Sequence, residues 1–319
     1  STDVTLTTTD SNVTFSSTVD SDAIGTKRDL TLTLGSGAAT FSGIVGTTSL
    51  ADISLNSSAT FNAAVTADNL TIAASKTATV KDDVTIASNI ALSGSSTLEV
   101  LNASIMSIAG SITDTGAGNT ITVNDSNATD AAPDEVTFLS IVAADTLTIG
   151  SSTTAGQAKF TGSGGVTIAN ITVTGGNHAD EDSTATFNYA LTSTAITLDD
   201  NTGSAYLIFA ENNSVTIAGT IDGAANNEGT LQVTGTLKTF SSNVGSTYYL
   251  KLLDIDADVT FGGNVTTYQL DLGADILDSG DVTIKGSSTI DTDVNSQGPQ
   301  IYDGDVILTT SLTLDSNNN

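Results

Sequence analysis

The chain repeats one short phrase, a phenylalanine followed four positions later by a valine. The phrase starts at Phe15, Phe41, Phe61, Phe138, Phe240 and Phe261, and Phe187 with Leu191 is a variant of it. Neighbouring copies lie 26, 20 and, late in the chain, 21 residues apart, which is the length that three short strands and their turns occupy. A unit of this size cannot bury its apolar face alone, whereas stacked units share a continuous core. The repeat therefore predicts a β-solenoid with the phenylalanines in its interior.

Apolar residues alternate with threonine, serine or aspartate along most of the chain. The segment "DVTLTTT" puts Val4 and Leu6 on one face, and "DLTLTLG" does the same for Leu30, Leu32 and Leu34. A period of two indicates strands, and the abundant threonine disfavours helices because its branched side chain loses freedom there. Clusters of glycine, asparagine, aspartate and serine between these segments predict short turns. We expect an all-β protein.

Residues 1–319 are expected to form a single elongated solenoid. The alternative is a row of tandem β-sandwich domains of roughly 100 residues each. Such domains would repeat at domain length and be joined by linkers, often rich in proline, but this repeat has coil length and the chain holds only 2 prolines. Two less regular stretches, near 124–135 and 175–184, are predicted to be longer surface loops.

Charge and composition restrict the partners and the compartment. The chain has 8 Lys and Arg against 36 Asp and Glu, a net charge of −28, which disfavours binding to nucleic acid and to anionic membrane surfaces. No apolar run reaches the roughly 18 to 20 residues of a transmembrane helix, so we expect no membrane insertion. Cysteine is absent, which excludes disulfides and thiolate chemistry. The composition favours an extracellular location.

Few residues are suited to catalysis. The single histidine, His178, lies in a polar loop segment, and no G-x-S-x-G phrase accompanies it, so a serine hydrolase is disfavoured. Paired carboxylates on either side of a glycosidic bond could cleave a polysaccharide, and the candidates are Asp82 with Asp83 and Asp199 with Asp200. Adjacent strand residues point to opposite faces, so these acids are expected to be solvated turn residues. We expect no enzyme, no catalytic residue and no organic cofactor.

Aromatic residues suited to sugar binding are also sparse. The chain has no tryptophan and six tyrosines, of which Tyr248, Tyr249 and Tyr268 gather late in the sequence. They are expected on neighbouring coils as an exposed or interface patch, with Tyr248 and Tyr249 facing opposite ways.

Calcium is the one ligand that clustered acids suggest. Side-chain and backbone oxygens of the kind it prefers gather in "DSNATD", "HADED" and "DIDAD", although none of these has the EF-hand spacing and the G-G-x-G-x-D repeat is absent. In the third segment the alternation predicts three carboxylates on one strand face, where they would repel one another without a cation. The candidate ligands are Asp254, Asp256, Asp258, Asp125 and Asp130.

Several phrases resemble those of large bacterial secreted and cell-surface β-repeat proteins, namely filamentous haemagglutinin-like and autotransporter-passenger-like adhesins. They include "DVTFGGNVTT", "DLTLTLGSGAATFSGIVG" and "SQGPQIYDGDVILTTSLTLDS". The resemblance extends over most of the chain and is one of style, without a single diagnostic motif. It implies a right-handed parallel β-solenoid outside the cell, with roles in adhesion, surface layers or fibres.

The leading hypothesis is a structural role, as a subunit or segment of a bacterial surface fibre, layer or filament. Strand-like segments at both ends of the sequence have unpaired edges in a solenoid, and such edges accept further strands. Head-to-tail association with copies of itself does not close and generates a filament. The alternative is an adhesin that binds a receptor or a glycan on a cell surface through its loops.

Overall fold

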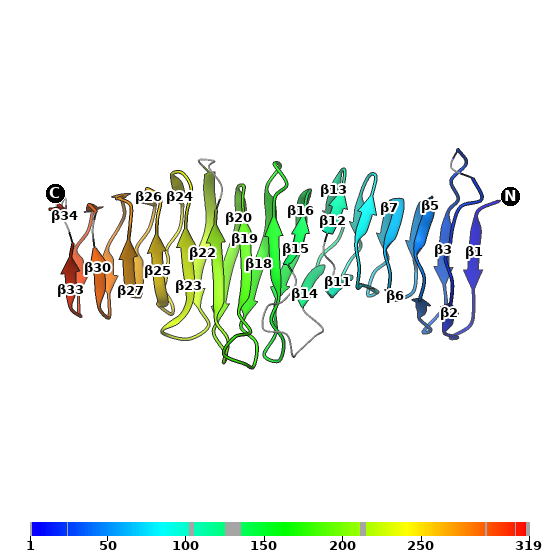
Figure 1. Cartoon of the computed structure of the whole chain (residues 1–319), viewed down its shortest axis with the longest axis horizontal. Helices are drawn as coiled ribbons and strands as arrows, with labels where there is room; N and C mark the ends of the chain where they lie inside the picture. The colour runs from blue at the N-terminus through cyan, green and yellow to red at the C-terminus, as the bar shows by residue number, and fades with distance from the viewer. Residues whose placement is uncertain are drawn as a thin grey trace.

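The chain folds into an all-β parallel solenoid of about 13 turns, with its two ends at opposite ends of an elongated molecule (Figure 1). The computed structural model describes residues 2–23, 25–101, 105–124, 135–210, 215–290, 292–309 and 311–316. The predicted solenoid is confirmed, and the described residues contain strands but no helix, hence none that could span a membrane. Handedness stays a prediction.

Each turn visits three parallel ladders, which we call faces 1, 2 and 3 in chain order. Strands of face 1 are β1 (Val4–Thr7), β3 (Leu30–Thr33), β10 (Ile90–Leu92), β13 (Ser111–Asp114), β24 (Lys238–Phe240), β26 (Val259–Phe261), β28 (Ile276–Asp278), β31 (Val294–Ser296) and β34 (Leu314–Ser316). Strands of face 2 are β2 (Val13–Phe15), β4 (Ala39–Phe41), β6 (Ala59–Phe61), β8 (Thr77–Val80), β11 (Thr97–Leu101), β14 (Thr120–Asn124), β29 (Val282–Ile284) and β32 (Gln300–Tyr302). Strands of face 3 are β9 (Val84–Ile86), β12 (Ile105–Ile108), β15 (Glu135–Phe138), β17 (Gln157–Phe160), β19 (Ser183–Phe187), β21 (Ala205–Phe209), β23 (Glu228–Val233), β25 (Leu250–Ile255), β30 (Ser288–Ile290) and β33 (Val306–Leu308).

The remaining strands are longer and contribute to two faces each. Strands β5 (Val45–Leu55) and β7 (Val65–Ile72) pass from face 3 to face 1, β16 (Ile141–Ile149), β18 (Val166–Thr174), β20 (Leu191–Asp199) and β22 (Val215–Gly223) pass from face 1 to face 2, and β27 (Val265–Leu272) passes from face 2 to face 3.

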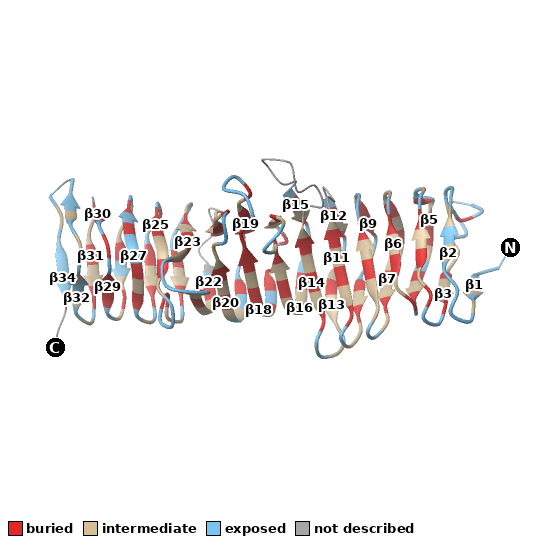
Figure 2. Cartoon of the chain, turned by 90° about the horizontal axis from the view of Figure 1, so that it is seen from below, coloured by how far each residue is buried: buried red, intermediate tan, exposed pale blue. Residues whose placement is uncertain are grey.

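The two-residue period of the sequence becomes an inside and an outside. In β6, for example, Ala59 and Phe61 are buried and Thr60 between them is only partly buried. The same alternation runs along β11 and β14 in Figure 2. Because parallel strands of successive turns pair in register, like side chains stack on like ones, and the core is one column of aliphatic and phenyl groups.

The phenylalanines form three stacked columns, one on each face. Their members are Phe15, Phe41 and Phe61 on face 2, Phe138, Phe160, Phe187 and Phe209 on face 3, and Phe240 and Phe261 on face 1. Within the first two columns, ring centroids lie 4.5 to 5.8 Å apart. A T-shaped contact of 5.4 Å between Phe209 and Phe240 joins the columns of faces 3 and 1.

The recurring phrase is therefore a corner motif, because the phenylalanine ends one strand and the valine starts the next. Phe61 ends β6 and Val65 starts β7, and Phe261 and Val265 stand in the same relation. Six of the seven phenylalanines predicted to be buried are at most 2% exposed. Phe15 is only partly buried, since its turn lies at the end of the stack.

Aspartate and asparagine side chains tie successive turns together at the corners. Each stands where the chain enters a face and accepts a hydrogen bond from the backbone N–H of the equivalent residue one turn later. Before face 1, Asp3 accepts from Asp29 at 3.2 Å and Asp29 accepts from Asp52 at 3.1 Å. Near the other end, Asp258 accepts from Asp275 and Asp275 from Asp293, at 3.2 and 2.9 Å. Many of the acids are thus structural caps.

Two glycines follow the corner motif directly. Gly46 comes after Val45 on face 3 and Gly245 after Val244 on face 2, and they have φ of 85° and 68°. An added Cβ would lie 2.0 Å from the Thr66 carbonyl oxygen and 1.9 Å from that of Thr266. Only glycine suits a left-handed backbone pressed so closely on the next turn.

Candidate functional site

The predicted calcium ligands of "DIDAD" do not share one strand. Strand β25 ends at Ile255, so Asp254 lies on face 3 while Asp256 and Asp258 follow in the turn. Asp254 accepts a hydrogen bond from Gln232 Nε2 at 3.0 Å and lies in register beside Asp271. The Oδ1 atom of Asp258 is occupied by the backbone N–H of the next turn.

These carboxylates have separate partners, and the described residues contain no group of three histidine or acidic side chains arranged to hold a metal ion. The other two candidate ligands, Asp125 and Asp130, and the predicted loop near 124–135 lie almost wholly outside the described residues. Calcium binding stays a prediction.

Asp254 is in an unfavourable place for a charge. Burial raises its pKa, and the nearby carboxylates of Asp256 and Asp271 raise it further, while the hydrogen bond from Gln232 opposes them. Burial and like charge both disfavour the ionised form. A proton or a cation at this position would relieve the repulsion.

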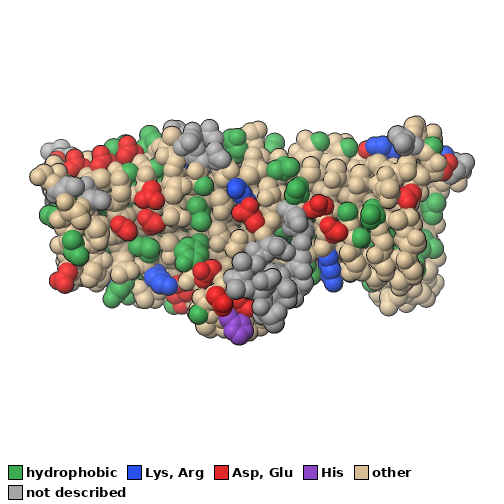
Figure 3. Space-filling view, viewed as in Figure 1, with side chains coloured by type: hydrophobic (Ala, Val, Ile, Leu, Met, Phe, Trp, Pro, Cys, Tyr) green, Lys and Arg blue, Asp and Glu red, His purple; other side chains and the backbone are tan. Residues whose placement is uncertain are grey.

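A second group of acids lies where the loops of the middle turns project from the rod. Residues 175–182 connect β18 to β19, and this loop carries the exposed His178 (Figure 3). Its Glu181 is 4% exposed and accepts a hydrogen bond from the N–H of Asn177 at 3.0 Å. Asp182 accepts from the N–H of Ser204 at 2.7 Å. The buried and half-buried acids of this loop shape the backbone.

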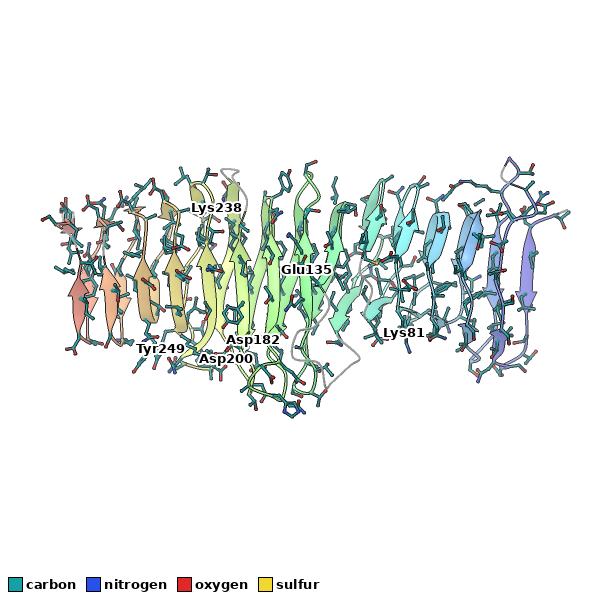
Figure 4. The ribbon with its side chains drawn as sticks, in the orientation of Figure 1. Lys81, Glu135, Asp182, Asp200, Lys238 and Tyr249 are labelled. Carbon is teal, nitrogen blue, oxygen red and sulfur yellow. The ribbon has the colours of Figure 1, made fainter. Side chains whose placement is uncertain are left out.

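Members of the two acid pairs also accept hydrogen bonds from backbone N–H groups. Asp200, labelled in Figure 4, accepts from the N–H of Ala205 at 2.7 Å. It also forms an ion pair with Lys251 at 3.2 Å. Burial raises the pKa of Glu228, the hydrogen bond from the N–H of Ala225 opposes this, and the charges of Asp199 and Asp200 raise the pKa further. In the other pair, Asp82 accepts from the N–H of Asp83 at 2.7 Å, and Asp83 accepts from that of Ile105 at 3.0 Å.

The late tyrosines do come together on neighbouring turns. The rings of Tyr249 and Tyr268 lie 6.5 Å apart at 19° to each other. Tyr268 is 39% exposed and Tyr248, beside Tyr249 in the same turn, is 44% exposed. We call the stacked pair Tyr249 and Tyr268, with their exposed neighbour Tyr248, the aromatic patch.

One buried charged residue was not foreseen. Lys238 is 1% exposed in β24, and its Nζ donates to the Thr236 carbonyl oxygen at 2.8 Å. The stretch "TLKTF" has the alternation of a strand, and an inward lysine could have been read from its place two positions before Phe240.

The end turns expose inward-pointing apolar side chains. Within the described residues, β1 pairs only with β3, β33 only with β30 and β34 only with β31. Leu308 continues the column of Leu272 and Ile290, which are fully buried, yet Leu308 itself is 52% exposed. At the other end Val4 is 54% exposed. Both ends are open stacking surfaces.

Known proteins offer no guide to the role of these surfaces: no family model matches the chain, and neither a curated protein nor a solved structure is similar to it.

Proposed function

We propose that this chain is a structural segment of an extracellular bacterial fibre, layer or filament, in which turns continue head-to-tail from one unit to the next. The observation that carries the proposal is the open stacking surface at each end, where strand edges are unpaired and core-facing side chains such as Leu308 are half exposed. Covering these groups buries apolar area and pairs free backbone groups. Further turns of a longer polypeptide or a second copy would both satisfy them.

The test is the assembly state of the purified chain. Negative-stain microscopy and sedimentation over a concentration series should show filaments that lengthen with concentration, because a head-to-tail contact does not close. Deleting residues 1–9 or 312–319 should leave the strand signal in circular dichroism and abolish the filaments.

Two point variants separate end-to-end contacts from nonspecific association through exposed apolar residues. Leu308→Asp places a charge on the end surface and should block assembly. Leu139→Asp changes an equally exposed apolar residue, 49% against 52%, in the middle of the rod, and should leave assembly intact. A chain that stays monomeric at high concentration, or equal effects of the two variants, would contradict the proposal.

The second candidate is an adhesin that binds a glycan or a cell-surface receptor. The aromatic patch of Tyr248, Tyr249 and Tyr268 favours it, because stacked rings offer apolar faces or edges to a sugar. Binding on a glycan array that is lost in Tyr268→Ala, and kept when Tyr206, a half-buried tyrosine of β21, is replaced by alanine, would support this role. If no glycan binds, the adhesin candidate is rejected and the structural role is the one that stays.

A further inference from the structure

Face 2 carries outward threonines in register on four successive turns. The turns are those of β14, β16, β18 and β20, in which buried aliphatic residues alternate with partly exposed ones. The outer positions form two ranks, Thr122, Thr148, Thr172 and Thr197 in one, and Thr120, Thr146, Asn170 and Ala195 in the other. We call these eight residues the threonine array. No register shift interrupts their pairing.

The hydroxyl groups of the array are not used by the protein. Within the described part of the chain, the side chains of its six threonines form no hydrogen bond with another group. Elsewhere on face 2, by contrast, Thr79 donates to Glu99 Oε2 at 2.7 Å. The array also contains no charged residue, in a chain with 36 acids. Its surface therefore presents methyl and hydroxyl groups, together with the single amide of Asn170, between the acids Glu99 and Asp222 that adjoin the first rank in register.

The spacing of these groups is set by the solenoid. Along the rod, stacked rings of the same turns measure the repeat directly, since Phe138, Phe160 and Phe187 follow one another at 4.8 Å. Across the rod, the two ranks are two residues apart on a strand, roughly 6.6 Å. Threonine is stiff at χ1, so both spacings are held before any ligand arrives.

We propose that the threonine array is an ice-binding surface. Its short repeat is close to the repeat of oxygen atoms along the shortest axis of hexagonal ice, so hydroxyls can hydrogen-bond to the lattice while methyls occupy the spaces between lattice oxygens. A preorganised array loses little conformational entropy on binding. The array has neither an aromatic platform for a soluble sugar nor a charge for an ion. An extended crystalline ligand therefore suits it better.

The experiment uses the purified full chain in dilute buffer and two matched variants. Thermal hysteresis and partition into a slowly growing ice hemisphere are measured for the wild type, for Thr148→Tyr in the centre of the array, and for Thr85→Tyr at an exposed outward position of face 3. The wild type and Thr85→Tyr should bind ice. Thr148→Tyr should lose binding, because one large ring lifts a flat crystal off its neighbours.

Circular dichroism and the filament assay above should be unchanged in both variants, which separates this inference from the structural role. A wild type that shows no hysteresis and is excluded from ice would overturn the proposal. So would a Thr148→Tyr variant that still binds ice, or equal losses in the two variants. Binding to crystalline cellulose through the same array, without binding to ice, would assign the surface to a polysaccharide instead.

Discussion

The contribution of a residue to the stability of this solenoid depends on its place in a column. An inward residue touches its equivalents one turn above and one below, so an interior position has two stacking partners and an end position has one. The outward residues also meet their equivalents, which makes a column of threonines harmless and a pair of aspartates unfavourable. Phe61 and Asp254 show the two cases.

Replacing Phe61 by alanine should cost about 3 to 5 kcal/mol in the free energy of unfolding. The side chain is fully buried, and its ring lies 4.7 Å from that of Phe41. The matched variant Phe15→Ala, at a partly buried end position, should cost clearly less. Urea unfolding followed by circular dichroism measures both, and equal losses would argue against end positions being weaker.

Asp254→Asn should raise the melting temperature at neutral pH. The folded state raises the pKa of this carboxyl through burial and through Asp256 and Asp271, so ionisation destabilises the fold. This penalty is present above the folded-state pKa and is relieved as the pH falls from there towards the unfolded value of about 3.9. The gain in Asp254→Asn should therefore disappear in acid.

Melting curves between pH 3 and pH 8 provide the measurement. Asp305→Asn removes one charge elsewhere on the surface and controls for the change in net charge. A gain in Asp254→Asn that is the same at all pH values, or that Asp305→Asn reproduces, would disagree with a local origin.

At the scale of strands and corners, much of the fold follows from the sequence pattern. Alternation predicted the strands, and the spacing of the phenylalanines predicted the length of a turn. The face on which each phenylalanine lies could not be predicted, because the phrase describes one corner and says nothing about which of three corners it is. Between Phe61 and Phe138 the motif moves from face 2 to face 3, and by Phe240 it has moved to face 1.

The corner caps were missed although the sequence contains a signal for them. An aspartate or asparagine stands directly before an aliphatic residue at many points where the chain enters a face, as in "DVTL", "DLTL", "DISL" and "NLTI". From the sequence alone these acids look solvated or like calcium ligands, because the N–H group that donates to each of them belongs to the next turn, 17 to 26 residues away. A local motif does not reveal a partner at that distance.

Asp275→Ala should destabilise the fold by about 1 kcal/mol, since it leaves the N–H of Asp293 without its acceptor. Asp275→Asn is the matched control, because it removes the same charge and keeps an acceptor oxygen. The difference in melting temperature between the two variants isolates the cap. Equal melting temperatures would mean that water replaces the carboxylate at no cost.

For the whole molecule, the sequence predicted an elongated stack with open ends but could not locate its usable surfaces. Net charge and composition are sums over the chain, whereas the end surfaces, the aromatic patch and the threonine array arise from residues that are distant in sequence and meet on neighbouring turns. Threonine was read as a strand former, and its two ranks on face 2 became visible only once the register was known.

Salt should control the assembly of the chain, because each unit carries a net charge of −28 and head-to-tail docking brings two such units together. Raising monovalent salt from 0.01 to 0.1 M shortens the screening length from about 30 Å to about 10 Å, so filaments should lengthen over this range in sedimentation and negative stain.

Calcium is then added at constant ionic strength, with magnesium as the control. A further gain with calcium alone, lost in Asp256→Asn, would support a specific site near Asp254, whereas equal effects of the two ions would reduce their role to screening. Filaments whose length ignores salt altogether would mean that the docking ends are shielded from the charge of the rod, and the electrostatic account of assembly would fail.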